Sequence, residues 1–362
     1  MRLLLPIIVL LTIASSAGCG GFYGQAVRGH MDVMSKRQPI AEVLLAPDTS
    51  EDLQRQLALV LEARQFASSQ LDLPDNDSYT TYVALDRDYV VWNVFATPEF
   101  SVEPRQWCFP VAGCVVYRGY FAQADANAYA GKLADQGFDV YVGGVAAYST
   151  LGRFDDPVLS TMMSWDDDQL IAILFHELAH QRLYVKDDSQ FNEGFATAVE
   201  ELGMARWFEG LGDAAGYAAF KLKQERSRAF NLLLSNTREH LAEIYRGGED
   251  DTVMAQLKAQ EFEGLERRYQ ALRRSWNGYA GYDRWFASPI NNARFVPVST
   301  YGRLVPAFRA LFRQSGEDFA AFYAACEELA DLAPAQRQAK LDALLAISSP
   351  TADSQLPESG TE

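Results

Sequence analysis

Two of the four histidines in this 362-residue chain lie four positions apart inside one hydrophobic segment. They are His176 and His180, within Leu-Ile-Ala-Ile-Leu-Phe-His-Glu-Leu-Ala-His over residues 170–180. Positions four apart share one face of a helix, so both imidazoles could bind one metal ion. Histidines on a solvated helix face are the alternative, but the segment is apolar nearly all round, and buried ionisable groups need partners or a metal. We therefore expect a buried helix with a metal site.

Glu177 completes the pattern His-Glu-x-x-His, which is typical of zinc hydrolases. In that chemistry zinc polarises a bound water, and a nearby carboxylate takes its proton as the water attacks a carbonyl. Glu177 directly follows the first histidine and can lie beside the metal without binding it. The motif predicts one zinc ion as cofactor, with His176 and His180 as ligands and Glu177 as general base.

Catalytic zinc sites usually have a third protein ligand. Two glutamates downstream are candidates, because Glu193 and Glu200 lie 13 and 20 positions after His180. Both belong to a second expected helix, with Ser189 as its predicted N-cap, and seven positions place them on the same helix face. The residues alone leave both candidates open.

The segment Asn-Glu-Gly-Phe-Ala at 192–196 resembles the one that follows His-Glu-x-x-His in gluzincin metallopeptidases. The resemblance implies that Glu193 is the third ligand. It also implies that Glu200 accepts a hydrogen bond from a ligand imidazole and holds its tautomer. The interval after His180 is shorter than in the better-known gluzincins, and Glu200 would restore a thermolysin-like interval.

Three further segments resemble a bacterial family of lipid-anchored envelope proteins, the putative aminopeptidases. These segments are Trp107–Cys114, Tyr117–Phe121 and Gly143–Gly152. The resemblance implies a gluzincin-like α+β fold and a peptide substrate. The chain lacks the Gly-x-Met-Glu-Asn strand with which alanyl aminopeptidases bind the substrate amine. An endopeptidase or another amide hydrolase therefore stays open, as does a non-catalytic scaffold lipoprotein that binds partners.

Substrate-binding residues are expected in the segment just before the zinc helix. In similar peptidases an edge strand there pairs with extended substrate, which makes Gly144 and Tyr148 candidates; an ordinary glycine turn is the alternative. An oxyanion donor is also needed, and gluzincins often use a tyrosine from a later helix. Tyr301 is the first choice, with Tyr279 and Tyr282 as rivals.

Residues 1–18 have the layout of a bacterial lipoprotein signal peptide. Arg2 precedes an apolar run that is too short to span a bilayer, and small residues lead to Cys19. The pattern resembles a lipobox, which implies lipidation of Cys19 and, with glycine next, an outer-membrane location facing the periplasm. A plain signal peptide is the alternative.

The remaining cysteines agree with an exported protein. Cys108 and Cys114 enclose a Pro and Gly turn and are expected to form a disulfide, with a zinc pair as the rival, whereas Cys326 reads as a buried small residue. The net charge of −16 disfavours nucleic-acid binding and offers no attraction to anionic membrane surfaces. The oligomeric state stays open.

The chain is expected to fold as α+β, with a small N-terminal mixed sheet packed on a largely helical C-terminal part that carries the zinc helices. Strands are predicted at 89–95 and 138–142 and helices at 50–70 and 122–136. We place the α/β part at 19–162, the helical part at 163–347 with a long hairpin over 221–276, and a disordered tail at 348–362.

Overall fold

A computed structural model describes residues 22–109, 113–298 and 303–348, and shows an α+β protein that is mostly helical. The chain divides into two compact units. Unit 1 comprises Met1–Arg64, Asn76–Ile171 and Ala214–Ser299, and unit 2 comprises Gln65–Asp75, Ala172–Asp213 and Thr300–Glu362. The predicted signal peptide, Cys19, Tyr301 and residues 349–362 of the predicted tail lie outside the described residues.

Unit 1 contains three small sheets. The mixed sheet β1-β2-β8 joins Gln38–Pro39, Thr81–Val83 and Val158–Leu159, with β2 parallel to β8. The antiparallel sheet β6-β3-β7 joins Arg118–Tyr120, Val91–Pro98 and Phe138–Val145. A hairpin pairs β4, Trp107–Phe109, with β5, Gly113–Val115.

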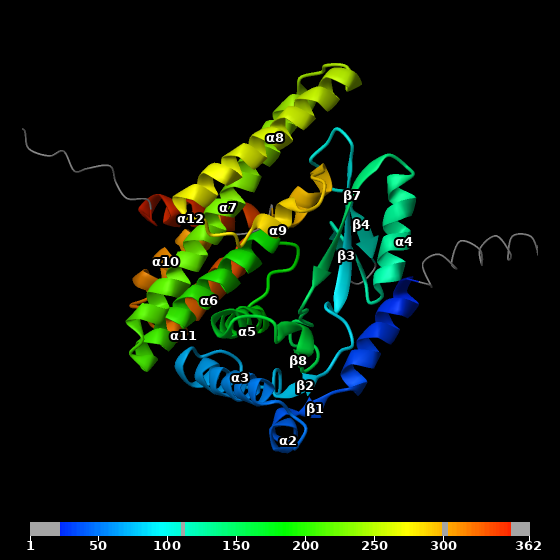
Figure 1. The fold of residues 1–362 in the computed structure, drawn as a ribbon. Coiled ribbons are helices and arrows are strands. Elements are labelled where there is room, and N and C mark those ends of the chain that lie inside the picture. Colours follow the sequence, from blue (N-terminus) through cyan, green and yellow to red (C-terminus); the bar gives the residue numbers. More distant parts are fainter. Residues whose placement is uncertain (1–21, 110–112, 299–302, 349–362) are drawn as a thin grey trace, which may run out of the picture. The chain divides into compact units, whose positions relative to one another are not determined.

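The core of unit 1 forms where α4, Gln123–Ala134, packs on β3 and β7 (Figure 1). Trp92, Val94 and Ala96 on β3 are buried with Ala126 and Leu133 of α4. These β3 residues alternate along the strand, as expected where one face of a sheet is covered by a helix. Among the described strands, β7 lies at the edge of its sheet, and it covers the strand predicted at 138–142.

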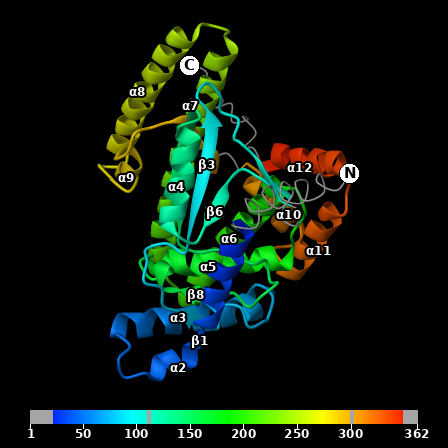
Figure 2. The same cartoon turned by 90° about the vertical axis from the view of Figure 1, so that its right-hand side faces the viewer.

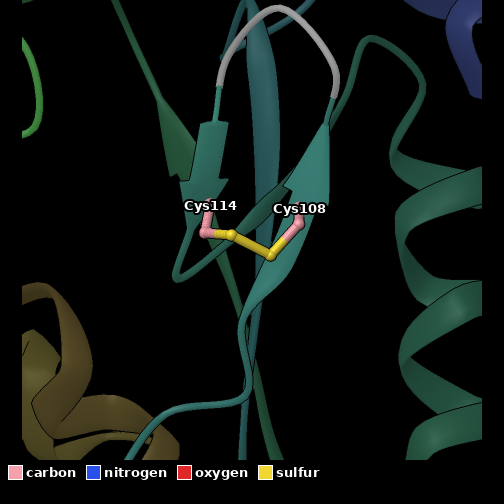
Figure 3. Close-up of a disulfide and its surroundings, with 2 residues drawn as sticks. All are labelled: Cys108 and Cys114. Carbon is pink, nitrogen blue, oxygen red and sulfur yellow. A yellow bond between two sulfur atoms is a disulfide. The ribbon is translucent and has the colours of Figure 1, made fainter.

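Cys108 and Cys114 form a disulfide between the two strands of the β4–β5 hairpin (Figure 3). They lie directly opposite one another in the antiparallel register. Both thiols are used in this bond, so the two cysteines do not form the zinc pair that was the alternative. Cys326 is free and fully buried, which agrees with its expected packing role.

Helices α7, Ala214–Arg246, and α8, Asp251–Ser275, form the long antiparallel hairpin that the sequence predicts (Figure 1). Asp250 caps α8 by accepting hydrogen bonds from the amides of Thr252 and Val253. The other helices of unit 1 include one over 22–35, then α2 at Ile40–Leu45, α9 at Asp283–Phe286, η1 at Ser160–Met162 and η2 at Asn292–Val298.

The division of the chain differs from the expected boundary at residue 162, because the hairpin belongs to unit 1. A hydrophobic cluster explains this grouping, since Phe230 and Leu265 of the hairpin are buried with Val102 from the sheet region and Phe295 of η2. This cluster joins segments that are far apart in sequence, so composition along the chain does not reveal it.

Unit 2 is helical. It holds α6, Ser189–Leu211, with α10, Val305–Gln314, α11, Phe319–Ala330, and α12, Pro334–Ser348 (Figure 2). Two helices pass from one unit into the other along the chain, namely α3, Glu51–Gln70, and α5, Asp167–Arg182. None of the described helices has the length and apolar character needed to cross a bilayer.

The disulfide closes a short loop, and its removal is expected to lower the free energy of unfolding by about 2 kcal/mol. We predict this loss for the double variant C108S/C114S in denaturant unfolding. Reductant should destabilise the wild type by a similar amount and leave the double variant unchanged. Equal stability of the oxidised wild type and the variant would show that the bond does not support unit 1.

Candidate metal centre

The two motif histidines lie on α5, in the part that belongs to unit 2. His176 and His180 are 8% and 6% exposed, and their ring centroids are 4.8 Å apart. Their neighbours on the same helix, Phe175, Leu178 and Ala179, are fully buried, so this part of the helix lies in the protein interior. One helical turn thus places two imidazoles side by side in a largely apolar setting, as the sequence predicts.

Glu193 on α6 brings a carboxylate to both imidazoles. One carboxylate oxygen lies 3.4 Å from Nε2 of His176, and the other lies 3.7 Å from Nε2 of His180. Ligand atoms of these three residues all lie within 4.8 Å of one another, a geometry in which one ion could contact all three. Two imidazoles and a carboxylate are a ligand set that suits zinc. The residues present therefore fit a metal ion.

Glu200 lies on the far side of His176. Its carboxylate is 3.1 Å from Nδ1 of His176, while Nε2 of the same ring faces Glu193. A hydrogen bond from Nδ1 to a carboxylate leaves Nε2 with its lone pair available and fixes the ring orientation. Between the two candidates for the third ligand, Glu193 is the one that faces both histidines.

The surrounding protein groups shift the pKa values of the two imidazoles in opposite directions. Burial lowers the pKa of His176, but hydrogen bonds to Glu193 and Glu200 outweigh it and raise the pKa to about 10. Burial and the neighbouring charge of His176 lower the pKa of His180 to about 4. Burial also acts on Glu193, but His176 and His180 hold its pKa below the usual value. A metal ion that binds here competes with a proton on His176.

Glu177 is half-buried on α5, and its charge contributes to the raised pKa of His176. Its carboxylate therefore lies close enough to the two-histidine group to act on it electrostatically. Nδ1 of His180, in contrast, is buried without a hydrogen-bond partner among the described residues.

Asn192 holds the connection between α5 and α6 in place. Its side-chain oxygen accepts a hydrogen bond from the amide of Val185 at 2.7 Å, and its side-chain nitrogen donates to the carbonyl of Val185, also at 2.7 Å. Asn192 is 1% exposed. These two bonds fix the short connection between α5 and α6, so that the next residue, Glu193, faces the histidines.

The N-terminus of α6 is also fastened to α12. Asp188 caps α6 by accepting a hydrogen bond from the amide of Phe191, and it pairs with Arg337 of α12 at 2.8 Å. The predicted cap, Ser189, is wrong by one residue, because the Asp188 side chain reaches the orphan amide and also binds a buried cation. Arg337 is 5% exposed.

The last three residues of the Asn-Glu-Gly-Phe-Ala segment pack α6 against other parts of unit 2. A Cβ on Gly194 would lie 2.8 Å from Cβ of Leu304, so only glycine allows α10 to approach this closely. Phe195 is fully buried and stacks on Phe322, and Ala196 is also fully buried. The segment thus combines a loop clamp, a carboxylate that faces both histidines, and a close helix contact.

Residues 21–341 match the model of a family described as "Putative aminopeptidase". The chain belongs to this family. The match covers most of the chain, including every residue of the candidate metal centre. No curated protein and no solved structure matches the chain.

In this aminopeptidase-family protein the other predicted site residues lie in unit 1 or outside the described residues. Gly144 sits on the edge strand β7, where a Cβ would overlap the ring of Tyr89. The hydroxyl of Tyr148 lies 2.8 Å from Nδ1 of His30. Of the rival tyrosines, Tyr282 stacks on Phe230, and Tyr279 lies under Arg226.

Three residues near the centre were not singled out by the sequence. Tyr184 lies just past the end of α5, and its ring centroid is 6.3 Å from that of His180. Helical spacing does not mark it, because it lies outside the helix that carries His180. Asn192 belongs to the Asn-Glu-Gly-Phe-Ala segment, but that resemblance does not give its role, because its contact with Val185 forms only in the fold. Arg337 carries no signal in the sequence, since only the fold brings it near Asp188.

The two glutamates are expected to differ in their effect on metal binding. We predict that E193Q abolishes tight zinc binding, because it removes a ligand. E200Q should keep one ion per chain and weaken binding by roughly 10- to 100-fold, because it removes only the partner of a ligand. Zinc titration with a competing chelator measures both, and E209Q, an exposed glutamate on the same helix, is the matched control. The reverse order of effects would exchange the two roles.

The Asn192 clamp is expected to support both stability and the metal centre. N192A leaves the amide and carbonyl of Val185 without partners, so we predict a loss of about 2 kcal/mol in the free energy of unfolding. Zinc affinity should fall with it. Q190A changes an exposed residue on the first turn of the same helix and serves as the control. A loss no larger than that of Q190A would contradict the proposed clamp.

Proposed function

We propose that the protein is a zinc-dependent metallopeptidase of gluzincin type that acts as an aminopeptidase. One observation carries the proposal: the two carboxylate oxygens of Glu193 face Nε2 of His176 and Nε2 of His180. Membership in the aminopeptidase family supports the substrate class. His176, His180 and Glu193 would hold the ion, and Glu200 would hold His176.

Bound there, a zinc ion would supply Lewis-acid activation of a water molecule and of the scissile carbonyl. Glu177 accepts the proton of the attacking water and delivers it to the leaving amine. Its place next to His176 in sequence keeps its carboxylate beside the site. Glu200 keeps the Nδ1 proton of His176 in place throughout. Tyr184, exposed and close to His180, is available to contact the substrate.

We further propose that residues 1–18 are removed on export and that Cys19 carries a lipid. The disulfide Cys108–Cys114 supports an oxidising compartment, since such bonds are rare in the cytosol. The location would be the outer membrane, facing the periplasm. The substrate would then be a peptide of the cell envelope.

The zinc chemistry is tested by replacing the proposed base. E177Q should keep the zinc content of the wild type and lose roughly 10²- to 10⁴-fold in kcat, because only proton transfer is removed. Metal analysis and peptide hydrolysis are measured on the same samples. Full activity of E177Q would contradict the assignment of the base. A zinc-loaded wild type that hydrolyses no peptide would favour a non-catalytic scaffold.

The mode of cleavage is tested with matched pairs of peptides. We expect hydrolysis of peptides with a free N-terminal amine and little or none of the same peptides after N-acetylation. Selectivity for the free amine requires a group that binds it, and the absence of the Gly-x-Met-Glu-Asn strand means that this group differs from the one in alanyl aminopeptidases. Equal cleavage of both forms would assign an endopeptidase on the same site.

A further inference from the structure

The helix over residues 22–35 has one face fixed to unit 1 (dark blue in Figure 1). Gln25 donates to the carbonyl of Gly119 at 3.1 Å and accepts from the amide of Phe121 at 3.2 Å. Gly29 lies so close to Phe121 that a Cβ would overlap its ring, and Val33 is fully buried. These contacts fix the rotation of the helix about its own axis.

A second face of this helix exposes large apolar side chains. Tyr23, Val27 and Met31 are 36%, 61% and 59% exposed, and their spacing of four places them in one stripe. Phe154, which is 52% exposed, extends the patch, because its ring centroid lies 4.9 Å from that of His30 on the same helix. Single exposed apolar residues are ordinary, but a contiguous stripe of this kind marks a contact surface.

The chain before this helix indicates what the stripe contacts. Phe22 comes three positions after Cys19, so the chain between them reaches about 10 Å even when fully extended. A lipid on Cys19 would therefore hold the first turn of the helix at the bilayer surface. An apolar stripe on a helix held there can enter the boundary between headgroups and acyl chains.

The charges near the stripe suit phospholipid headgroups. Arg28 is exposed next to Val27 in sequence, whereas Lys36 is paired with Asp32 at 2.8 Å and Arg37, past the end of the helix, donates to the carbonyl of Asp155. The net charge of the whole chain is negative, but a membrane surface responds to the charges within a Debye length of it. Arg28 is thus the cation that the helix presents to lipid phosphates.

We propose that Tyr23, Val27 and Met31 lie in the headgroup region of the phospholipid membrane that holds Cys19. The contact rests on the proposed lipid anchor and is independent of the zinc chemistry. It would add a second attachment to the acylated cysteine, and it would give unit 1 a defined orientation toward the bilayer.

Fluorescence quenching on the lipidated full-length protein tests this contact. V27C and D32C each introduce one exposed cysteine, on the stripe and on the polar face of the same helix. Cys108 and Cys114 are bridged, Cys326 is buried, and the thiol of Cys19 would carry the proposed lipid, so an environment-sensitive dye reports on the new position. The protein is reconstituted into vesicles of phosphatidylethanolamine and phosphatidylglycerol. Aqueous iodide and a doxyl-labelled lipid are the two quenchers.

The dye on V27C should be quenched by the doxyl lipid and protected several-fold from iodide, and the dye on D32C should behave in the opposite way. Equal accessibility of both positions to iodide would overturn the proposal. Protection of V27C from iodide without quenching by the lipid would also overturn it, and would assign the stripe to a protein partner or a second copy.

Two further readouts separate this proposal from the proposed function. Mass spectrometry of the N-terminal peptide reports the lipid, and its absence on Cys19 would overturn the membrane contact while leaving the peptidase intact. A dye on R28C, next to Val27, should be protected from iodide when the stripe is intact. The triple variant Y23S/V27S/M31S should lose this protection. Its peptide hydrolysis in detergent should equal that of the wild type.

Discussion

The carboxylate of Glu193 has to face two imidazoles that lie one helical turn apart, and several contacts in unit 2 hold it in that position. Two helices joined by a short connection could place that carboxylate in many ways. Asn192 removes this freedom by binding both backbone groups of Val185. Asp188 and Arg337 hold the start of the same helix. Gly194 then allows α10 to pack closely just after the carboxylate.

The same arrangement explains why buried ionisable groups are tolerated here. His176 is 8% exposed and would be costly alone, but it is hydrogen-bonded on one nitrogen by Glu200 and faces Glu193 with the other. The two glutamates differ in chemistry because they meet opposite nitrogens of one ring. Nε2 of His176 faces Glu193, which also faces Nε2 of His180, whereas Nδ1 of His176 meets Glu200. The ring thus separates the side on which an ion could bind from the side that Glu200 supports.

Local pattern predicted the elements of the site well, because helix periodicity and the His-Glu-x-x-His spacing are properties of neighbouring residues. The helices that hold His176 and Glu193, the strand that begins at Phe138 and the long hairpin all follow from such patterns. Spacing alone left Glu193 and Glu200 open, since a loop length does not say which carboxylate meets which nitrogen. The grouping of the hairpin with unit 1 and the role of Arg337 depend on contacts across long stretches of chain, and no local pattern encodes them.

The central claim is that His176, His180 and Glu193 together hold one zinc ion. X-ray absorption and an anomalous difference map of the zinc-loaded protein test it most directly. The account predicts one ion per chain, bound by Nε2 of both histidines and by a carboxylate oxygen of Glu193 at about 2.0–2.2 Å, with no sulfur ligand. An ion bound by Glu200 in place of Glu193, or a protein that takes up no zinc, would contradict it.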